Sequence, residues 1–192
     1  MARISLDHQD TALYRLGQWY SRRRYGAVLD PGRALWHNRR VLWAELRFEQ
    51  AIAKFDKLDP VLKHLAVMAA AARIGCSWCL DFGYWEAGRL GIAPEKIRAV
   101  PSWRDHREQF SGTEQAVLEY AEAVCETEPA VTDELAAQLC ALLGEAAFVE
   151  LTVMVGVENL RSRVNSALGL RSQGFADNCE IPAVTSQRWR AP

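Results

Sequence analysis

Cys76 and Cys79 are the residues of this chain whose type and spacing most directly suggest chemistry. On a helix, their i, i+3 spacing places both sulfurs on one face, close enough to form a reversible disulfide. If the helix begins at the pair, its unpaired N–H groups and its dipole stabilise a thiolate, which is the reactive form of cysteine. Peroxide reduction and thiol–disulfide exchange both require these two properties.

Three other interpretations of the pair compete with this one. A thioredoxin-like fold places such a pair after a β-strand, and the residues before Cys76 have no strand pattern. A four-cysteine zinc site needs a second close pair, whereas Cys125, Cys140 and Cys179 are isolated along the chain. We therefore expect no metal, and we also expect no cofactor. Two buried cysteines packed as small apolar residues remain an open alternative.

The elements that position the pair are predicted to be helices, because apolar residues recur at spacings of three and four. Asp59 and Pro60 are suited to begin a helix that ends at Gly75, and the next helix begins around the pair and stops at Gly91. The remaining predicted helices are an N-terminal one with an apolar stripe (Leu13, Leu16, Trp19, Tyr20), 32–55 after a turn at 30–32, 94–98, 112–126, 132–143 and 145–168.

The fold class is therefore all-α, with the 192 residues forming one domain. Its core is expected to cover about residues 35–170, and residues 171–192 are expected to be irregular. Gly156 lies inside the longest predicted helix, where close approach by another helix would account for a glycine.

The pair and its surroundings resemble the alkylhydroperoxidase D and carboxymuconolactone decarboxylase family. The resemblance is strongest over residues 62–100, which include LKHLAVMAAAARIGCSWCLDFGYWEA, and weaker at 149–152 and 163–169. It implies a multi-helix orthogonal bundle of the alkylhydroperoxidase D type, usually oligomeric. It also implies that the pair reduces peroxides with electrons from another dithiol, with Cys79 attacking the peroxide and Cys76 resolving the product.

Two positions depart from the family's pattern. Peroxidase members carry a glutamate twelve residues before the first cysteine and a histidine four residues after the second, where this chain has His64 and Gly83. His64 is a candidate base because imidazole titrates near neutral pH, although twelve helical residues span ~18 Å unless the next helix doubles back. Glu86 is a second candidate, because Cys79, Gly83 and Glu86 share a helix face.

Aromatic side chains flank the pair at Trp78, Tyr84 and Trp85. They could line an apolar pocket for an organic hydroperoxide or a lipoyl arm, but aromatic residues at helical spacing usually belong to a core. Both interpretations stay open at the level of sequence.

Composition and charge limit the kinds of partner and the cellular location that we expect. The net charge of -1 gives no general attraction to nucleic acid or to anionic lipid, and the apolar stretches are too short to span a bilayer. Five cysteines without a disulfide-like spacing and an N-terminus without a secretory signal favour a reducing, cytoplasmic location. Seven tryptophans and long amphipathic helices, together with the family resemblance, favour a homo-oligomer.

The sequence thus favours a thiol-dependent peroxidase that acts on a small hydroperoxide and is re-reduced by an external dithiol. The alternative is a non-catalytic oligomeric scaffold or redox-sensing module that retained the fold. A lactone decarboxylase, suggested only by the family's name, is the weakest candidate, because no separate set of acid and base residues supports it.

Overall fold

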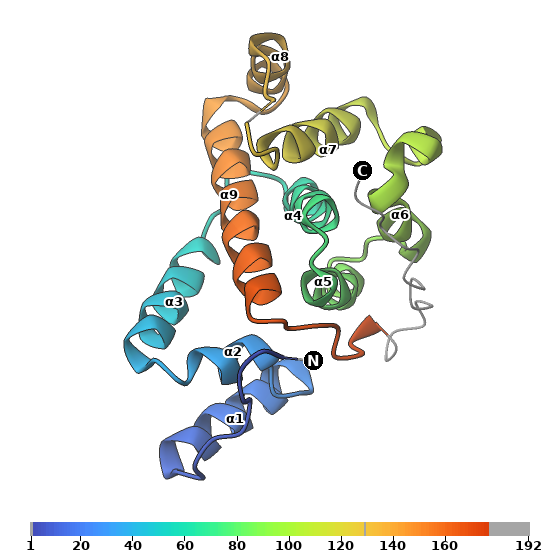
Figure 1. The fold of residues 1–192 in the computed structure, drawn as a ribbon. Helices are drawn as coiled ribbons and strands as arrows, with labels where there is room; N and C mark the ends of the chain where they lie inside the picture. Colours follow the sequence, from blue (N-terminus) through green and yellow to red (C-terminus); the bar gives the residue numbers. More distant parts are fainter. Residues whose placement is uncertain (1, 129, 177–192) are drawn as a thin grey trace. The chain divides into compact units, whose positions relative to one another are not determined.

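The computed structural model describes residues 2–128 and 130–176, and within them the regular elements are helices (Figure 1). The predicted all-α class is therefore confirmed. The chain divides into two compact units, whose described residues are 2–55 and 164–171 in the first and 56–128, 130–163 and 172–176 in the second. The expectation of a single domain with its core over 35–170 stays a prediction.

The first unit contains α1 (Ala12–Tyr25), α2 (Asp30–Leu35) and α3 (Arg39–Ile52). The single helix predicted over 32–55 is wrong, because Asn38 is extended and its side chain accepts a hydrogen bond from the Val41 N–H, which starts a new helix. The turn predicted at 30–32 is instead the first turn of α2, where proline is tolerated because the N–H it lacks would be unpaired there.

The apolar stripe predicted on α1 does not face the core of this unit. Its side chains are exposed: Leu13, Leu16, Trp19 and Tyr20. The buried residue of α1 is Tyr14, whose ring contacts His8 and Trp36. Arg33 also anchors the N-terminal residues, because its Nε donates to the Leu6 carbonyl at 2.9 Å.

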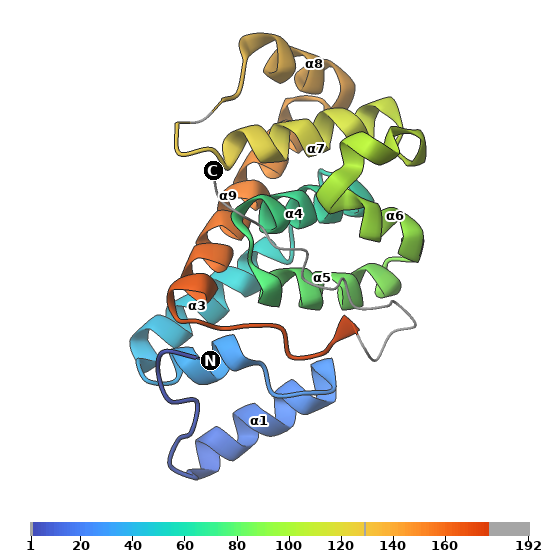
Figure 2. The same ribbon diagram turned by 45° about the vertical axis from the view of Figure 1, so that its right-hand side comes forward.

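The second unit is built around α4 (Pro60–Ile74), which lies between α5 (Ser77–Arg89) and α7 (Gly112–Val124), as Figure 2 shows. The predicted limits of these helices agree closely with the structure. Asp59 caps α4, and Ser111 and Glu114 form a capping box at the start of α7. The other elements of this unit are α6 (Pro94–Ala99), the 3₁₀ helix η1 (Val100–Gln109) and α8 (Asp133–Leu143).

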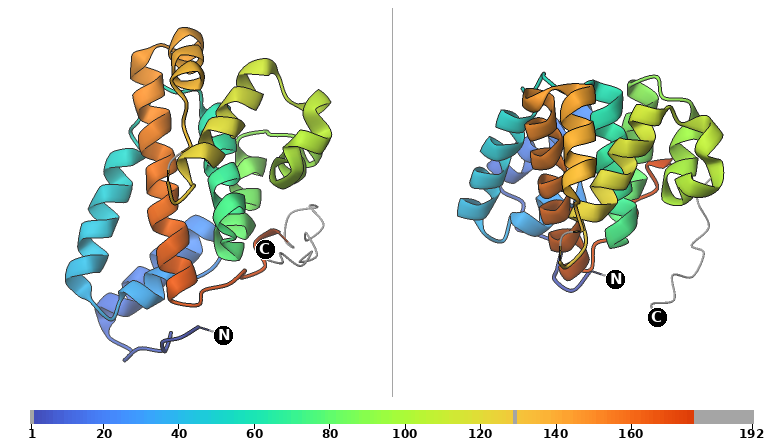
Figure 3. Two further views of the ribbon diagram at one scale, coloured as in Figure 1. Left: turned by 45° about the horizontal axis from the view of Figure 1, so that its top comes forward. Right: turned by 90° about the horizontal axis from the view of Figure 1, so that it is seen from above.

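The longest helix, α9 (Glu145–Ala167), is the orange helix in Figure 3. Its residues up to 163 belong to the second unit, where Leu151 and Val155 join the apolar core. The Thr152 hydroxyl lies 2.7 Å from the Tyr120 hydroxyl of α7. The close helix approach expected at Gly156 is wrong, because a Cβ built there meets no atom within 4 Å.

After α9 the described chain is irregular over residues 171–175. The rest of the predicted irregular tail, 177–192, lies outside the described residues. Among the described residues, no helix has both the length and the apolar character needed to cross a bilayer.

Candidate functional site

A two-residue connection places the cysteine pair at the start of α5. The chain leaves α4 at Gly75, whose φ of 81° is a left-handed conformation that glycine adopts without strain. The Cys76 N–H then donates to the Ala71 carbonyl at 3.0 Å, which completes the helix end. Cys76 also begins α5, because its sulfur accepts a hydrogen bond from the Cys79 N–H at 3.3 Å. The chain reverses within these residues, so α5 packs against α4.

Cys76 and Cys79 are bonded as a disulfide, with their Cα atoms 5.3 Å apart. The structure therefore brings together the two residues that the sequence singled out. Both are buried, with 1% of Cys76 and 8% of Cys79 exposed. Cys79 is the more accessible of the two.

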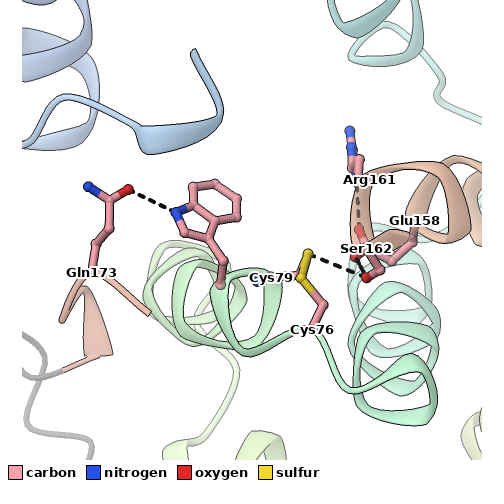
Figure 4. The surroundings of a disulfide bond; sticks show 7 residues. Cys76, Cys79, Glu158, Arg161, Ser162 and Gln173 are labelled. Atoms are coloured by element: carbon pink, nitrogen blue, oxygen red, sulfur yellow. Dashed lines mark hydrogen bonds and ion pairs between the residues drawn. A yellow bond between two sulfur atoms is a disulfide. The ribbon is translucent and has the colours of Figure 1, made fainter. Parts of the chain in front are cut away.

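A serine and a glutamate from α9 approach the Cys79 sulfur (Figure 4). The Ser162 hydroxyl lies 3.3 Å from Cys79 Sγ and 2.6 Å from Glu158 Oε1. The other carboxylate oxygen of Glu158 lies 3.6 Å from Arg161 Nη1. Glu158 is 2% exposed and Ser162 is fully buried. An ionisable carboxylate is thus connected to the sulfur through one hydroxyl.

Sequence reasoning missed Ser162 and Glu158. They are far from the cysteines along the chain and appear in the sequence as ordinary polar residues of a long helix. One weak signal was available, since the two residues are four apart and therefore lie on the same face of α9. Only the packing of α9 shows that this face contacts α5.

His64 of α4 reaches α5, because α5 doubles back along α4. This is the condition that the twelve-residue separation from Cys76 imposed. Its Nε2–H donates to the Gly83 carbonyl at 2.9 Å. Burial lowers the pKa of His64 to about 4, so the ring is neutral at pH 7 and has little affinity for a thiol proton. The hydrogen bond holds the ring against the backbone one turn after Cys79. A catalytic role for His64 stays a prediction, and this geometry favours a structural one.

Gly83 is the position where the peroxidase members carry their histidine. In this structure a Cβ at Gly83 would collide with the Met68 sulfur, which occupies that space. A histidine could therefore enter only if Met68 moved. The glycine at position 83 thus leaves room for Met68 of α4, which is fully buried.

Glu86 is exposed and follows Cys79 by seven residues, a rise of roughly 10 Å along the helix. The helix face predicted from the sequence runs from the interior, at Cys79 and Gly83, to the solvent, at Glu86. A catalytic role for Glu86 stays a prediction.

The opposite side of the α5 start is covered by the segment 173–176. The Asp81 carboxylate accepts hydrogen bonds from the N–H groups of Gln173 at 2.7 Å and Ala176 at 2.8 Å. The Trp78 indole donates to Gln173 Oε1 at 2.8 Å. Phe175 completes an aromatic cluster whose other members are Trp78, Phe82 and Trp85. Trp78 and Trp85 thus contribute to packing, which is one of the two roles that the sequence left open.

Comparison with known proteins identifies the family. The model of the carboxymuconolactone decarboxylase family matches residues 40–123, which include α4, the cysteine pair and α5. The YnjA protein of Escherichia coli (strain K12) is 35% identical over 177 residues, covering 88% of this chain and 91% of its own. The chain belongs to the carboxymuconolactone decarboxylase family.

Solved structures share the fold of this carboxymuconolactone decarboxylase family member. The debrominase Bmp8, as a cysteine-to-alanine variant in complex with 2,3,4-tribromopyrrole, superposes with a TM-score of 0.78 at 16% identity, covering 93% of this chain and 97% of its own. An Agrobacterium tumefaciens protein, whose name points to AhpD antioxidant defence, superposes with a TM-score of 0.66 at 22% identity, covering 71% and 92%. The predicted family and its alkylhydroperoxidase D-like fold are thereby confirmed.

Proposed function

We propose that this protein is a thiol-dependent peroxidase that cycles between the Cys76–Cys79 dithiol and its disulfide. The observation that carries the proposal is the pair itself, whose sulfurs are within bonding distance at the start of α5. The N–H groups and dipole of that helix end stabilise a thiolate. Family membership and the antioxidant name of one fold relative support the same chemistry.

The proposed reaction has two chemical steps and a reduction. The Cys79 thiolate attacks the terminal oxygen of a hydroperoxide, and the O–O bond breaks to give a Cys79 sulfenic acid and an alkoxide. The alkoxide takes up the proton that left the thiol and becomes an alcohol. The Cys76 thiol then displaces water from the sulfenic sulfur and forms the disulfide. An external dithiol reduces the disulfide and supplies the two electrons and two protons that the peroxide consumed.

The test is to mix the reduced protein with cumene hydroperoxide and to count its thiols. We expect the loss of two thiols per chain, no disulfide in Cys79→Ser, and a trapped sulfenic acid in Cys76→Ser. Cys140→Ser is the matched control, because Cys140 is partly exposed and lies outside the pair. An unchanged thiol count, or equal loss in Cys79→Ser, would contradict the proposal.

The alternative is a redox-sensing module or a scaffold, and burial of both cysteines is the observation that favours it. Turnover distinguishes these functions. With excess dithiothreitol, a peroxidase consumes many equivalents of hydroperoxide, whereas a sensor is oxidised readily but turns over slowly, and a scaffold retains its thiols.

A further inference from the structure

The positions that hold the proton relay in the peroxidase relatives are occupied here by groups poorly suited to it. The His64 ring is neutral and bonded to a backbone carbonyl, and the space for a histidine at Gly83 is filled by Met68. A peroxidase still needs a base for the attacking thiol and an acid for the departing alkoxide. Another group must therefore move these protons if the proposed function is correct.

We propose that Ser162 and Glu158 form the proton relay of Cys79. Ser162 is in contact with the reacting sulfur, at 3.3 Å, and is therefore the catalytic residue. Glu158 acts through the hydroxyl at 2.6 Å and is a positioning residue that stores the proton. This assignment rests on the proposed function, because it concerns the same thiol.

A hydroxyl group carries a single proton, and this fixes the direction of transfer. In the reduced protein the Cys79 S–H donates to Ser162 Oγ while the Ser162 O–H donates to the Glu158 carboxylate. Transfer along both hydrogen bonds leaves a Cys79 thiolate, an intact Ser162 hydroxyl and a neutral Glu158 acid. After the O–O bond breaks, the same path in reverse delivers that proton to the alkoxide. No proton is gained or lost from solvent during this step.

Burial strengthens the hydrogen bonds of the relay. Glu158 and Ser162 are shielded from water, so hydrogen bonds between them are stronger than on a surface. A buried carboxylate requires a compensating charge, and Arg161 supplies one at 3.6 Å while its own side chain remains 28% exposed. Because Glu158, Arg161 and Ser162 lie within five consecutive residues of α9, one helix holds the entire set in register.

The test is the pH dependence of disulfide formation after the reduced protein is mixed with cumene hydroperoxide. With the relay, the rate should be nearly independent of pH through neutrality, because Glu158 takes the thiol proton internally. In Ser162→Ala and Glu158→Gln we expect a rate about 10²–10⁴-fold lower at neutral pH. That rate should rise about tenfold per pH unit and approach wild type in alkali, where the thiol ionises by itself.

Controls separate the relay from a structural role. Ser162→Thr keeps a hydroxyl and should give a flatter pH profile than Ser162→Ala. Ser166→Ala makes the same truncation one turn later, on an exposed position of α9, and should keep the wild-type profile. Ser162→Ala and Glu158→Gln variants that retain the wild-type profile would overturn the relay. A variant equally slow at every pH would also overturn it, because a distorted site is not rescued by alkali.

A second electrophile tests the relay independently of peroxidase activity. If the wild-type dithiol does not react with cumene hydroperoxide, the same pH series is repeated with a small aromatic disulfide as the electrophile. Loss of the pH-independent rate in Ser162→Ala and Glu158→Gln would then support the relay without the peroxidase. An unchanged profile would overturn both.

Discussion

His64 is an ionisable side chain that the fold holds neutral. Burial lowers its pKa from 6.5 to about 4, so the unfolded chain binds a proton more readily than the folded chain between these values. The free energy of unfolding should therefore fall as the pH is lowered from about 6.5 to about 4. A shift of this size corresponds to about 3 kcal/mol when complete.

Denaturant unfolding of wild type and His64→Gln at pH 7 and near pH 4.5 measures this effect. Glutamine keeps an N–H donor for the Gly83 carbonyl but does not titrate, so the variant should lose less stability on acidification. Equal losses in the two proteins would show that His64 already titrates normally in the folded state.

At the scale of elements, α5 depends on the segment 173–176 as well as on α4. Asp81 accepts both backbone hydrogen bonds from that segment, and Asp81→Ala removes them together. We expect faster amide hydrogen exchange at Gln173 and Ala176 and a loss of about 1–3 kcal/mol in stability. Glu119→Ala is the control, because it removes an exposed carboxylate from α7, which also packs against α4. Unchanged exchange in Asp81→Ala would mean that the Trp78–Gln173 hydrogen bond and the aromatic contacts of Phe175 hold the segment without Asp81.

The helices that sequence reasoning predicted best are those with strong signals at their ends. Asp59 with Pro60, and Ser111 with Glu114, mark helix starts by side chains that bond to the backbone within three residues. The break at Asn38 was missed because the apolar pattern continues across it, and a single cap residue in such a pattern is easily taken for a helical one.

At the scale of the whole molecule, we propose that the chain assembles with copies of itself. The first unit leaves Leu16, Trp19 and Tyr20 of α1 more than half exposed, and exposed apolar stripes of this kind favour self-association. We expect the particle mass, measured by light scattering after gel filtration, to exceed 21.6 kDa. The double variant Leu16→Glu, Trp19→Glu should shift it toward that value.

Gln18→Glu serves as the control for assembly, because Gln18 lines a polar pocket on another side of α1 together with Arg15 and Arg22. It adds a carboxylate to the same helix without altering the apolar stripe. A wild-type protein that is monomeric at all concentrations, or a double variant that assembles like wild type, would contradict the proposed interface.

The sequence by itself determined the all-α class, the main helices and the importance of Cys76 and Cys79, because periodicity, helix caps and an i, i+3 pair are local properties. Only the tertiary structure decided what surrounds the sulfurs. Ser162 meets Cys79 because a turn of α9 lies beside the start of α5, and Glu158 is bonded to Ser162. His64 donates to a backbone carbonyl, and Glu86 is exposed. Contacts between residues distant along the chain depend on how helices pack, and no local pattern encodes that packing.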